Sequence, residues 1–259
     1  MLQGQARIAA FLYHDVTDDP SESGFQRRSA LRYKQTRNAF ASHLDGIARV
    51  GLTPKVVSKL NFQHPGKLVV ITFDDGGKGA LHAAEELNHR DWKGHFLITT
   101  GLLGTRTFLD ANQLRYLQSC GHVIGSHSHT HPDIFKGIPY AQMIREWRTS
   151  CDLLSDLLGI ECVTGSVPGG DVSRRVFRSA HEAGMKYLFT SDPILVPMKE
   201  GDCWILGRVC PRTDAPRFHI QKLAGFRGWK KELFIRRAKT AVKTTFSPLY
   251  RTYVRLALR

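Results

Sequence analysis

Apolar residues along the chain form short runs that are separated by stretches with helical periodicity. The runs at 7–14, 67–73 and 95–100 are rich in β-branched and aromatic residues, which is typical of buried strands. Between the first two, apolar residues recur every three or four positions over 37–51, and Gly51 ends the pattern. The pattern therefore predicts strands and helices in alternation.

The same alternation continues through the second half of the chain. Strands are predicted at 122–126, 163–169 and 187–191, and helices near 79–90, 111–121, 140–159 and 173–183. Strands separated by helices pair in parallel through right-handed crossovers. Six or more such units fit a barrel or a doubly wound sheet, and the pattern alone leaves both open.

Two adjacent carboxylates, Asp74 and Asp75, follow the predicted strand 67–73 and precede Gly76 and Gly77. Neighbouring side chains on a strand point to opposite faces, so both can serve one site only where the strand ends and turns. The carboxyl ends of parallel strands are where α/β proteins build active sites. Taken alone, however, this sequence is more typical of a solvated turn.

A group of histidines, His127, His129 and His131, follows the predicted strand 122–126. Imidazole and carboxylate together form a common zinc-binding set, and either an i, i+4 or an i, i+2 pair of histidines can converge on one ion. The alternative is a surface loop rich in histidine. A metal would account for the aspartate pair, because one carboxylate could ligate the ion while the other stays ionised as a base.

The motifs TFDDG at 72–76 and GHVIGSHSHTHP at 121–132 resemble those of the polysaccharide deacetylases of carbohydrate esterase family four. The likeness extends over roughly residues 7–210 and includes FLYHDV, SVPGG and AHEAGMKYLFTS. It implies an α/β fold, a distorted and incomplete (β/α) barrel with about seven parallel strands. To this fold we add a basic helical extension at the C-terminal end.

The resemblance assigns roles to single residues. It implies that Asp74 is the general base and that Asp75, His127 and His131 ligate a divalent metal, whereas His129 falls on a variable position of the motif. Zinc is the expected ion, with nickel, cobalt or iron as alternatives because such a ligand set discriminates poorly.

The loop SVPGG departs from the family pattern. The resemblance places Pro168 and Gly169 in the loop that contacts the substrate and implies that the Gly169 N–H stabilises the oxyanion. Ser166 stands where the family has an arginine that orients the catalytic aspartate. The sequence leaves open which residue replaces it, the candidates being Arg174, Arg175 and Arg208.

The catalytic acid has two candidates. His219 is a weak match to the late histidine that many relatives use, whereas His14 in FLYHDV matches an early tyrosine–histidine pair of others. A single histidine after an apolar strand is often structural. We nevertheless favour His14 as the acid, because it follows a strand at its predicted carboxyl end.

The resemblance implies a metal-dependent hydrolase that removes an N-acetyl group from an amino sugar in a polysaccharide, oligosaccharide or glycolipid. A deacylase or deformylase of a lipid-linked sugar at the membrane face is one alternative. A catalytically weakened, glycan-binding relative is another, and it is suggested by Ser166.

Charge divides the chain into two regions. The formal net charge is +14, and residues 227–259 hold ten Lys and Arg against Glu232 alone, which is +9 of that total. We therefore expect a catalytic domain at 1–226 and a basic amphipathic extension at 227–259. The extension suits an anionic membrane surface. The absence of an aromatic-interleaved basic motif argues against nucleic acid as a partner.

Five cysteines, an odd number without a Cys-x-x-Cys pair, favour a reducing compartment. The stretch before His14 is too short and lacks the cleavage site of a signal peptide. From these features we expect a cytoplasmic protein that binds peripherally to the inner face of the membrane.

Overall fold

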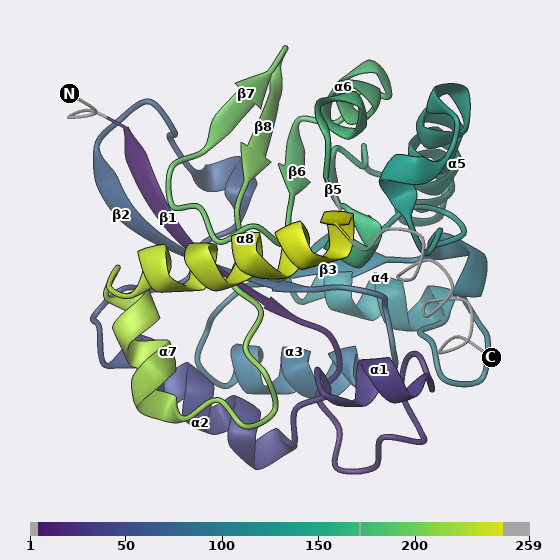
Figure 1. Cartoon of the computed structure of the whole chain (residues 1–259). Helices are drawn as coiled ribbons and strands as arrows, with labels where there is room; N and C mark the ends of the chain where they lie inside the picture. Colours follow the sequence, from purple (N-terminus) through teal and green to yellow (C-terminus); the bar gives the residue numbers. More distant parts are fainter. Residues whose placement is uncertain (1–4, 171, 246–259) are drawn as a thin grey trace.

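The computed structural model describes residues 5–170 and 172–245 and contains one curved sheet of eight strands (Figure 1). The strands follow the order β1-β2-β3-β4-β5-β6-β8-β7, and every neighbouring pair is parallel except the antiparallel pair of β7 and β8. Seven strands therefore form the parallel sheet that was expected. Their bounds are Ala6–Tyr13, Gly66–Phe73, His95–Ile98, Val123–Ser126, Thr164–Ser166, Tyr187–Phe189, Met198–Glu200 and Cys203–Leu206 for β1 to β8.

The sheet curls until its two ends nearly meet. Beyond β8, the chain returns to β1, where the Leu12 N–H donates to the Val209 carbonyl at 2.8 Å. The Val209 N–H in turn donates to the carbonyl of Ala10 at 3.0 Å. The barrel is therefore closed by a single bridge rather than by a full strand, which confirms the expected distorted and incomplete (β/α) barrel.

Helices lie around the outside of this sheet (Figure 1). A helix follows β2, β3, β4 and β5 in turn, as parallel strands require, and the two helices α7 and α8 follow β8. The helical bounds are Arg28–Leu31, Arg37–Ala48, Ala80–Asn88, Ala111–Ser119, Tyr140–Leu158, Arg174–Glu182, Arg217–Ala224 and Trp229–Thr245 for α1 to α8. The sequence analysis predicted α2 to α6, but it did not identify α1, α7 or the hairpin of β7 and β8.

Alternation along the strands separates two hydrophobic clusters. In β1, Ala9 and Phe11 belong to the larger cluster between sheet and helices, whereas Ile8 and Ala10 belong to a smaller one. The smaller cluster also takes residues from β2, β3, β6 and β8, so it fills the barrel interior. The barrel is thus a packed core, and its carboxyl end remains for a functional site.

The basic extension begins with α8, which crosses in front of the sheet (Figure 1). Trp229 anchors its first turn, because the indole is buried and its Nε1–H donates to the Leu223 carbonyl at 2.9 Å. The last part of the expected amphipathic extension, residues 246–259, lies outside the described residues. Within the described part of the chain, no helix combines the length and apolarity that crossing a bilayer requires.

Candidate active site

A sharp turn after β2 brings the two adjacent aspartates into one site. Alternate side chains of β2, those of Val70 and Thr72, face the barrel interior. Asp74 is the next residue in this series and lies at the carboxyl end of the strand. Asp75 has a φ of 78° and Gly76 a φ of 84°. This left-handed backbone, which is costly for a residue other than glycine, changes the direction of the chain immediately after Asp74. Both carboxylates are buried.

The histidine loop after β4 is held from outside by α5. Ser128 and His131 both adopt positive φ, 63° and 54°, so the loop turns twice within four residues. The buried Glu146 on α5 accepts hydrogen bonds from the N–H groups of His129 and Thr130 at 3.0 and 2.7 Å. The Thr130 hydroxyl donates to the same carboxylate at 2.6 Å. Glu146 therefore stabilises the conformation that directs His127 and His131 into the site.

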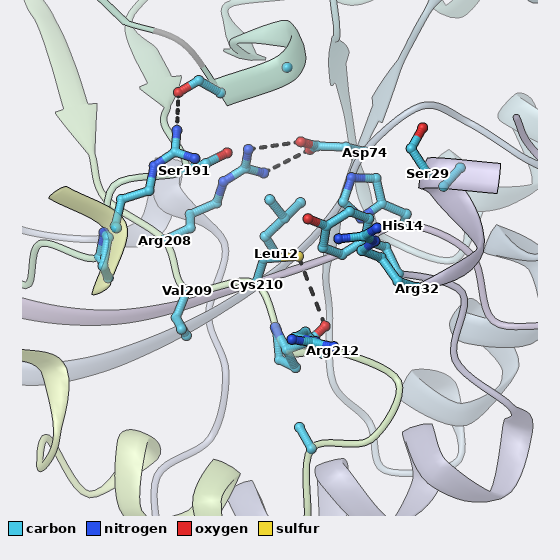
Figure 2. A pocket seen from close by; sticks show the side chains of 18 of the residues that line it. Leu12, His14, Ser29, Arg32, Asp74, Ser191, Arg208, Val209, Cys210 and Arg212 are labelled. Carbon is cyan, nitrogen blue, oxygen red and sulfur yellow. Dashed lines mark hydrogen bonds and ion pairs between the residues drawn. The ribbon is translucent and has the colours of Figure 1, made fainter. Parts of the chain in front are cut away.

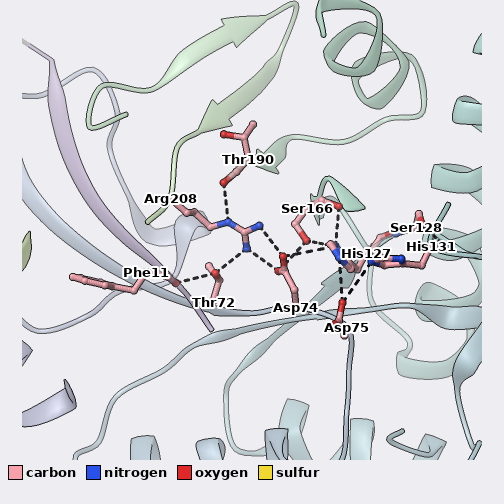
Figure 3. A network of polar contacts seen from close by, with 11 residues as sticks. Phe11, Thr72, Asp74, Asp75, His127, Ser128, His131, Ser166, Thr190 and Arg208 are labelled. Carbon is pink, nitrogen blue, oxygen red and sulfur yellow. Dashed lines mark hydrogen bonds and ion pairs between the residues drawn. The ribbon is translucent and has the colours of Figure 1, made fainter. Parts of the chain in front are cut away.

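Asp75, His127 and His131 come together as three potential metal ligands (Figure 3). Asp75 Oδ1 lies 3.4 Å from His127 Nε2 and 3.7 Å from His131 Nε2. Ligands of a tetrahedral zinc at about 2.0–2.1 Å are separated from one another by about 3.3–3.4 Å, so the donor atoms are suitably spaced. The sequence left two histidine spacings open, and the structure brings together the i, i+4 pair, His127 and His131, beside Asp75.

The other nitrogen of His127 links this triad to the second aspartate. His127 Nδ1 lies 2.6 Å from Ser166 Oγ and 3.1 Å from the Ser166 carbonyl, so it acts as the protonated nitrogen. The Ser166 hydroxyl donates to Asp74 Oδ1 at 3.0 Å. This arrangement leaves His127 Nε2 unprotonated toward Asp75, as metal ligation requires. The residues present therefore fit a divalent metal.

Arg208, in the segment after β8, orients Asp74 (Figure 3). Its guanidinium donates to both carboxylate oxygens of Asp74 at 2.7 and 2.8 Å and is fully buried. Further bonds to the Thr190 carbonyl and the Thr72 hydroxyl fix the orientation of the guanidinium. Of the arginines considered from the sequence, Arg174 is exposed and pairs with Glu200, and Arg175 lies over the ring of Tyr140.

Electrostatics distinguishes the two aspartates. Burial raises the pKa of Asp74, but the charge of Arg208, together with His127 and the hydrogen bonds from Arg208, outweighs it and lowers that pKa to about 2. Burial, reinforced by repulsion from Asp74 and Asp15, raises the pKa of Asp75 well above its usual value. The charges of Arg27 and Lys34 offset this rise only in part, so a bound cation would stabilise the ionised form of Asp75.

Burial also favours the neutral imidazoles. It lowers the pKa of His127, and together with His127 and Arg27 it lowers the pKa of His131 to about 3. Neutral imidazole is the form that ligates a metal.

A large cavity opens from these residues (Figure 2). His14 lines it beside Asp74, and burial lowers the pKa of His14 to about 4. The buried Nδ1 of His14 has no hydrogen-bond partner among the described residues. His219, on α7, lines the same cavity and lies 3.5 Å from Glu232 through its Nε2. The structure thus places both candidate acids around one cavity.

The loop after β5 contributes Gly169 to the cavity lining, with a φ of 64°. Pro168 is buried in the same turn, Pro168–Gly170. His129 lies outside the triad, and its Nδ1 is 3.0 Å from the Thr100 hydroxyl. Its separation from the site agrees with its variable position in the motif.

Two residues important to this site were not identified, or not selected, from the sequence. Glu146 sits among Met143, Trp147 and Ser150 on the buried side of α5, and this charged residue in an apolar stripe was the available signal. Arg208 follows the apolar strand β8, as Asp74 follows β2. In both cases a charged residue follows an apolar strand at its carboxyl end, and this feature of the sequence could have identified Arg208 as a site residue.

Comparison with known proteins agrees with the family resemblance of the sequence motifs. Residues 62–188 match the family model described as polysaccharide deacetylase. The fold is similar to that of IcaB from Ammonifex degensii, with 20% identity, a TM-score of 0.71 and coverage of 86% of this chain and 98% of that one. No curated protein sequence matches the chain.

Two further solved structures have the same fold. One is a polysaccharide deacetylase from Bacillus cereus, with 17% identity, a TM-score of 0.72 and coverage of 85% of this chain and 69% of that one. The other is a de-N-acetylase from Aggregatibacter actinomycetemcomitans, with 19% identity, a TM-score of 0.68 and coverage of 84% and 99%. At these identities the likeness establishes the fold.

Proposed function

The chain belongs to the polysaccharide deacetylase family through residues 62–188, and from this premise we propose that it is a metal-dependent carbohydrate N-deacetylase. Its substrate is an N-acylated amino sugar, and the reaction hydrolyses the amide bond. One observation carries the proposal. The ionised carboxylate of Asp74 and the triad of Asp75, His127 and His131 face the same cavity.

The chain's own residues account for most of the chemistry. Asp75, His127 and His131 would hold the ion, zinc by preference, which would supply Lewis-acid activation of water and of the amide carbonyl. Asp74 accepts the proton of the attacking water, and Arg208 keeps that carboxylate ionised and oriented. Gly169 presents its backbone to the cavity, where its N–H would stabilise the developing oxyanion.

Protonation of the departing amine requires an acid. We assign this role to His14, because it lines the cavity beside Asp74 and its buried Nδ1 has no partner in the described part of the chain. His219 is the weaker candidate, since its imidazole is already paired with Glu232.

A catalytically weakened, glycan-binding relative is less well supported. The motivation for that alternative was Ser166, which occupies the place of an orienting arginine. Because Arg208 donates two hydrogen bonds to Asp74, a guanidinium from the segment after β8 is present in that role.

The location of the protein is part of the proposal. We propose that it acts at the inner face of the membrane, as a peripheral protein that contacts anionic lipid through residues 227–259. The net charge of +9 in this extension supports the proposal. So do Phe218 on α7 and Phe234 on α8, two exposed aromatic side chains of the kind that insert at a lipid surface.

The metal assignment is tested with four proteins: wild type, His127→Ala, His131→Ala and His129→Ala. Elemental analysis after purification should show that either ligand variant loses most of its metal, because two remaining ligands hold a labile ion poorly. His129→Ala is the matched control from the same loop and should retain wild-type occupancy. Full occupancy in His131→Ala would refute the triad.

The activity is tested by measuring acetate and formate released from N-acetyl- and N-formyl-hexosamine conjugates. Wild-type protein should release acid, and a chelator should abolish the release until metal is restored. Metal-loaded protein that binds such conjugates without releasing either acid would refute the hydrolase and support the glycan-binding alternative.

A further inference from the structure

The cavity around the triad is larger than a single sugar requires. Its volume is about 1340 Å³, whereas sites for small molecules usually measure about 300–1,000 Å³. Beyond the triad, the lining comes from the segment after α1, the segment 209–215 and the helices α7 and α8. This additional space has no role in the chemistry derived above, so its lining bears on what else the substrate carries.

Two arginines line this additional space from segments that are bonded to each other. The N–H and the hydroxyl of Thr213 donate to the Arg32 carbonyl at 3.2 and 2.8 Å, which brings Arg212 close to Arg32 (Figure 2). Arg32 has no ion-pair partner among the described residues. Arg212 lies 3.5 Å from Asp214, but both side chains are exposed and such a pair is weak.

The other arginines of the cavity are held by carboxylates of the protein. Arg208 is fully engaged by Asp74, Arg27 donates to Asp133 at 2.9 Å, and Arg236 donates to Asp192 at 3.1 Å. The positive charge available to a ligand therefore lies at Arg32 and Arg212. Guanidinium groups bind phosphate with directed, charge-assisted hydrogen bonds, so this pair suits a phosphate group.

Apolar side chains line the same cavity. Leu223 of α7 and Ile235 and Ala238 of α8 contribute to the lining, with Val209 and Ala215 from the segment between β8 and α7. The apolar surface continues beyond the cavity. Phe218 and Phe234, the chain neighbours of the lining residues His219 and Ile235, are 70% and 73% exposed.

We propose that the substrate is an amphiphile in which the N-acylated amino sugar is joined through a phosphate to a hydrocarbon chain. The guanidinium groups of Arg32 and Arg212 bind the phosphate, and the apolar lining from α7 and α8 contacts the first carbons of the chain. This inference rests on the proposed deacylase function and narrows its substrate. It also gives the exposed Phe218 and Phe234 a role, since the rest of the hydrocarbon would remain in the bilayer beside them.

The proposal is tested by calorimetric binding of four probes to the full-length protein. They are the dodecyl phosphodiester of N-acetylglucosamine 1-phosphate, its methyl phosphodiester, dodecyl N-acetylglucosaminide without phosphate, and the nucleotide sugar UDP-N-acetylglucosamine. The dodecyl phosphodiester should bind at least about tenfold more tightly than each of the others, because only it engages both the arginines and the apolar lining.

Variants locate the contacts. The double variant Arg32→Gln/Arg212→Gln should lower affinity for the dodecyl phosphodiester about tenfold or more and leave affinity for the phosphate-free glucosaminide unchanged. Arg115→Gln, an exposed arginine on α4, is the matched control and should bind all probes as wild type does.

Equal wild-type affinity for the dodecyl phosphodiester and the phosphate-free glucosaminide would overturn the phosphate contact. Equal affinity for the dodecyl and methyl phosphodiesters would overturn the apolar contact. Tighter binding of UDP-N-acetylglucosamine would assign the arginines to a nucleotide sugar instead. Failure of the proposed function is distinct, since it appears as binding without release of acetate from any probe.

Discussion

Asp74 and Asp75 are adjacent in the chain and nearly equally buried, yet their surroundings favour opposite charge states. Arg208 donates to both oxygens of Asp74, whereas Asp75 faces two imidazoles that burial keeps neutral. A carboxylate with a fixed guanidinium partner stays ionised without a metal. One without such a partner is expected to depend on the metal, and the two residues should therefore respond differently to the same substitution.

We expect Asp74→Asn to keep its metal and to lower kcat by about 10²–10⁴, the usual contribution of a general base. Asp75→Asn should instead lose metal, because an amide is a poorer ligand than a carboxylate. Metal analysis and acetate release on the same samples separate the two effects. An active Asp74→Asn protein would mean that the base lies elsewhere.

A buried histidine that is not part of the site makes stability depend on pH. His95 is fully buried, its Nδ1 donates to the Ile71 carbonyl and its Nε2 accepts from the Val57 N–H, so the imidazole is neutral. Burial lowers the pKa of His95 from 6.5 to about 4. Between these values the unfolded chain binds a proton that the folded protein does not, so stability falls as pH falls from 6.5 toward 4.

The contribution of His95 amounts to about 1.4 kcal/mol per pH unit within that window. His95→Gln should therefore show a smaller loss of unfolding free energy between pH 6.5 and 4.5, as measured by urea denaturation of metal-free protein. The exposed His64→Gln is the control and should keep the wild-type slope. An unchanged slope in His95→Gln would contradict the assignment.

At the scale of elements, the histidine loop depends on α5 for its shape. Glu146 accepts three hydrogen bonds from His129 and Thr130. A carboxylate that fixes a ligand-bearing loop is expected to influence metal affinity without touching the metal.

Glu146→Gln should weaken metal affinity by about 10–100-fold, because an amide can accept at only one of the two oxygen positions. Competition titration against a chelator measures this affinity. Asp152→Asn, an exposed carboxylate on the same helix, serves as the control. The unfolding temperature without metal distinguishes a loosened loop from a damaged fold, and unaltered affinity in Glu146→Gln would remove its positioning role.

At the scale of the whole molecule, the C-terminal part of the chain combines basic charge with exposed aromatic side chains. Phe218 and Phe234 lie on α7 and α8, and the extension 227–259 carries most of the net positive charge. Attraction to anionic lipid is weakened by salt, whereas insertion of aromatic side chains is affected much less. Both contributions can therefore be measured separately.

We expect full-length protein to co-sediment with anionic vesicles, less so as salt increases, and deletion of residues 227–259 to abolish most of this binding. Phe218→Ser/Phe234→Ser should weaken binding at all salt concentrations. Leu153→Ser, which changes an exposed apolar residue on α5, should not. Equal co-sedimentation of full-length and truncated protein would contradict membrane binding through residues 227–259.

Much of the fold could be predicted because its signals are local. Apolar runs alternating with amphipathic stretches give the strands β1 to β6 and the helices α2 to α6. The hairpin of β7 and β8 was not predicted because both strands are short and β7, with the sequence MKE, is polar and largely exposed, so only β8 carries an apolar run.

The sequence by itself placed Asp75 and the histidine group after two predicted strands, and the family resemblance implied Asp75, His127 and His131 as the candidate metal ligands, which the structure brings together. It could not select Arg208 over Arg174 and Arg175, because each carries the same charge and only the curl of the sheet brings the segment after β8 back beside β2. The loop contacts of Glu146 and the cavity lining from α8 likewise depend on packing between distant segments. Short-range pattern fixes which residues stand at a strand end, whereas tertiary structure determines which partners from other strands and helices reach them.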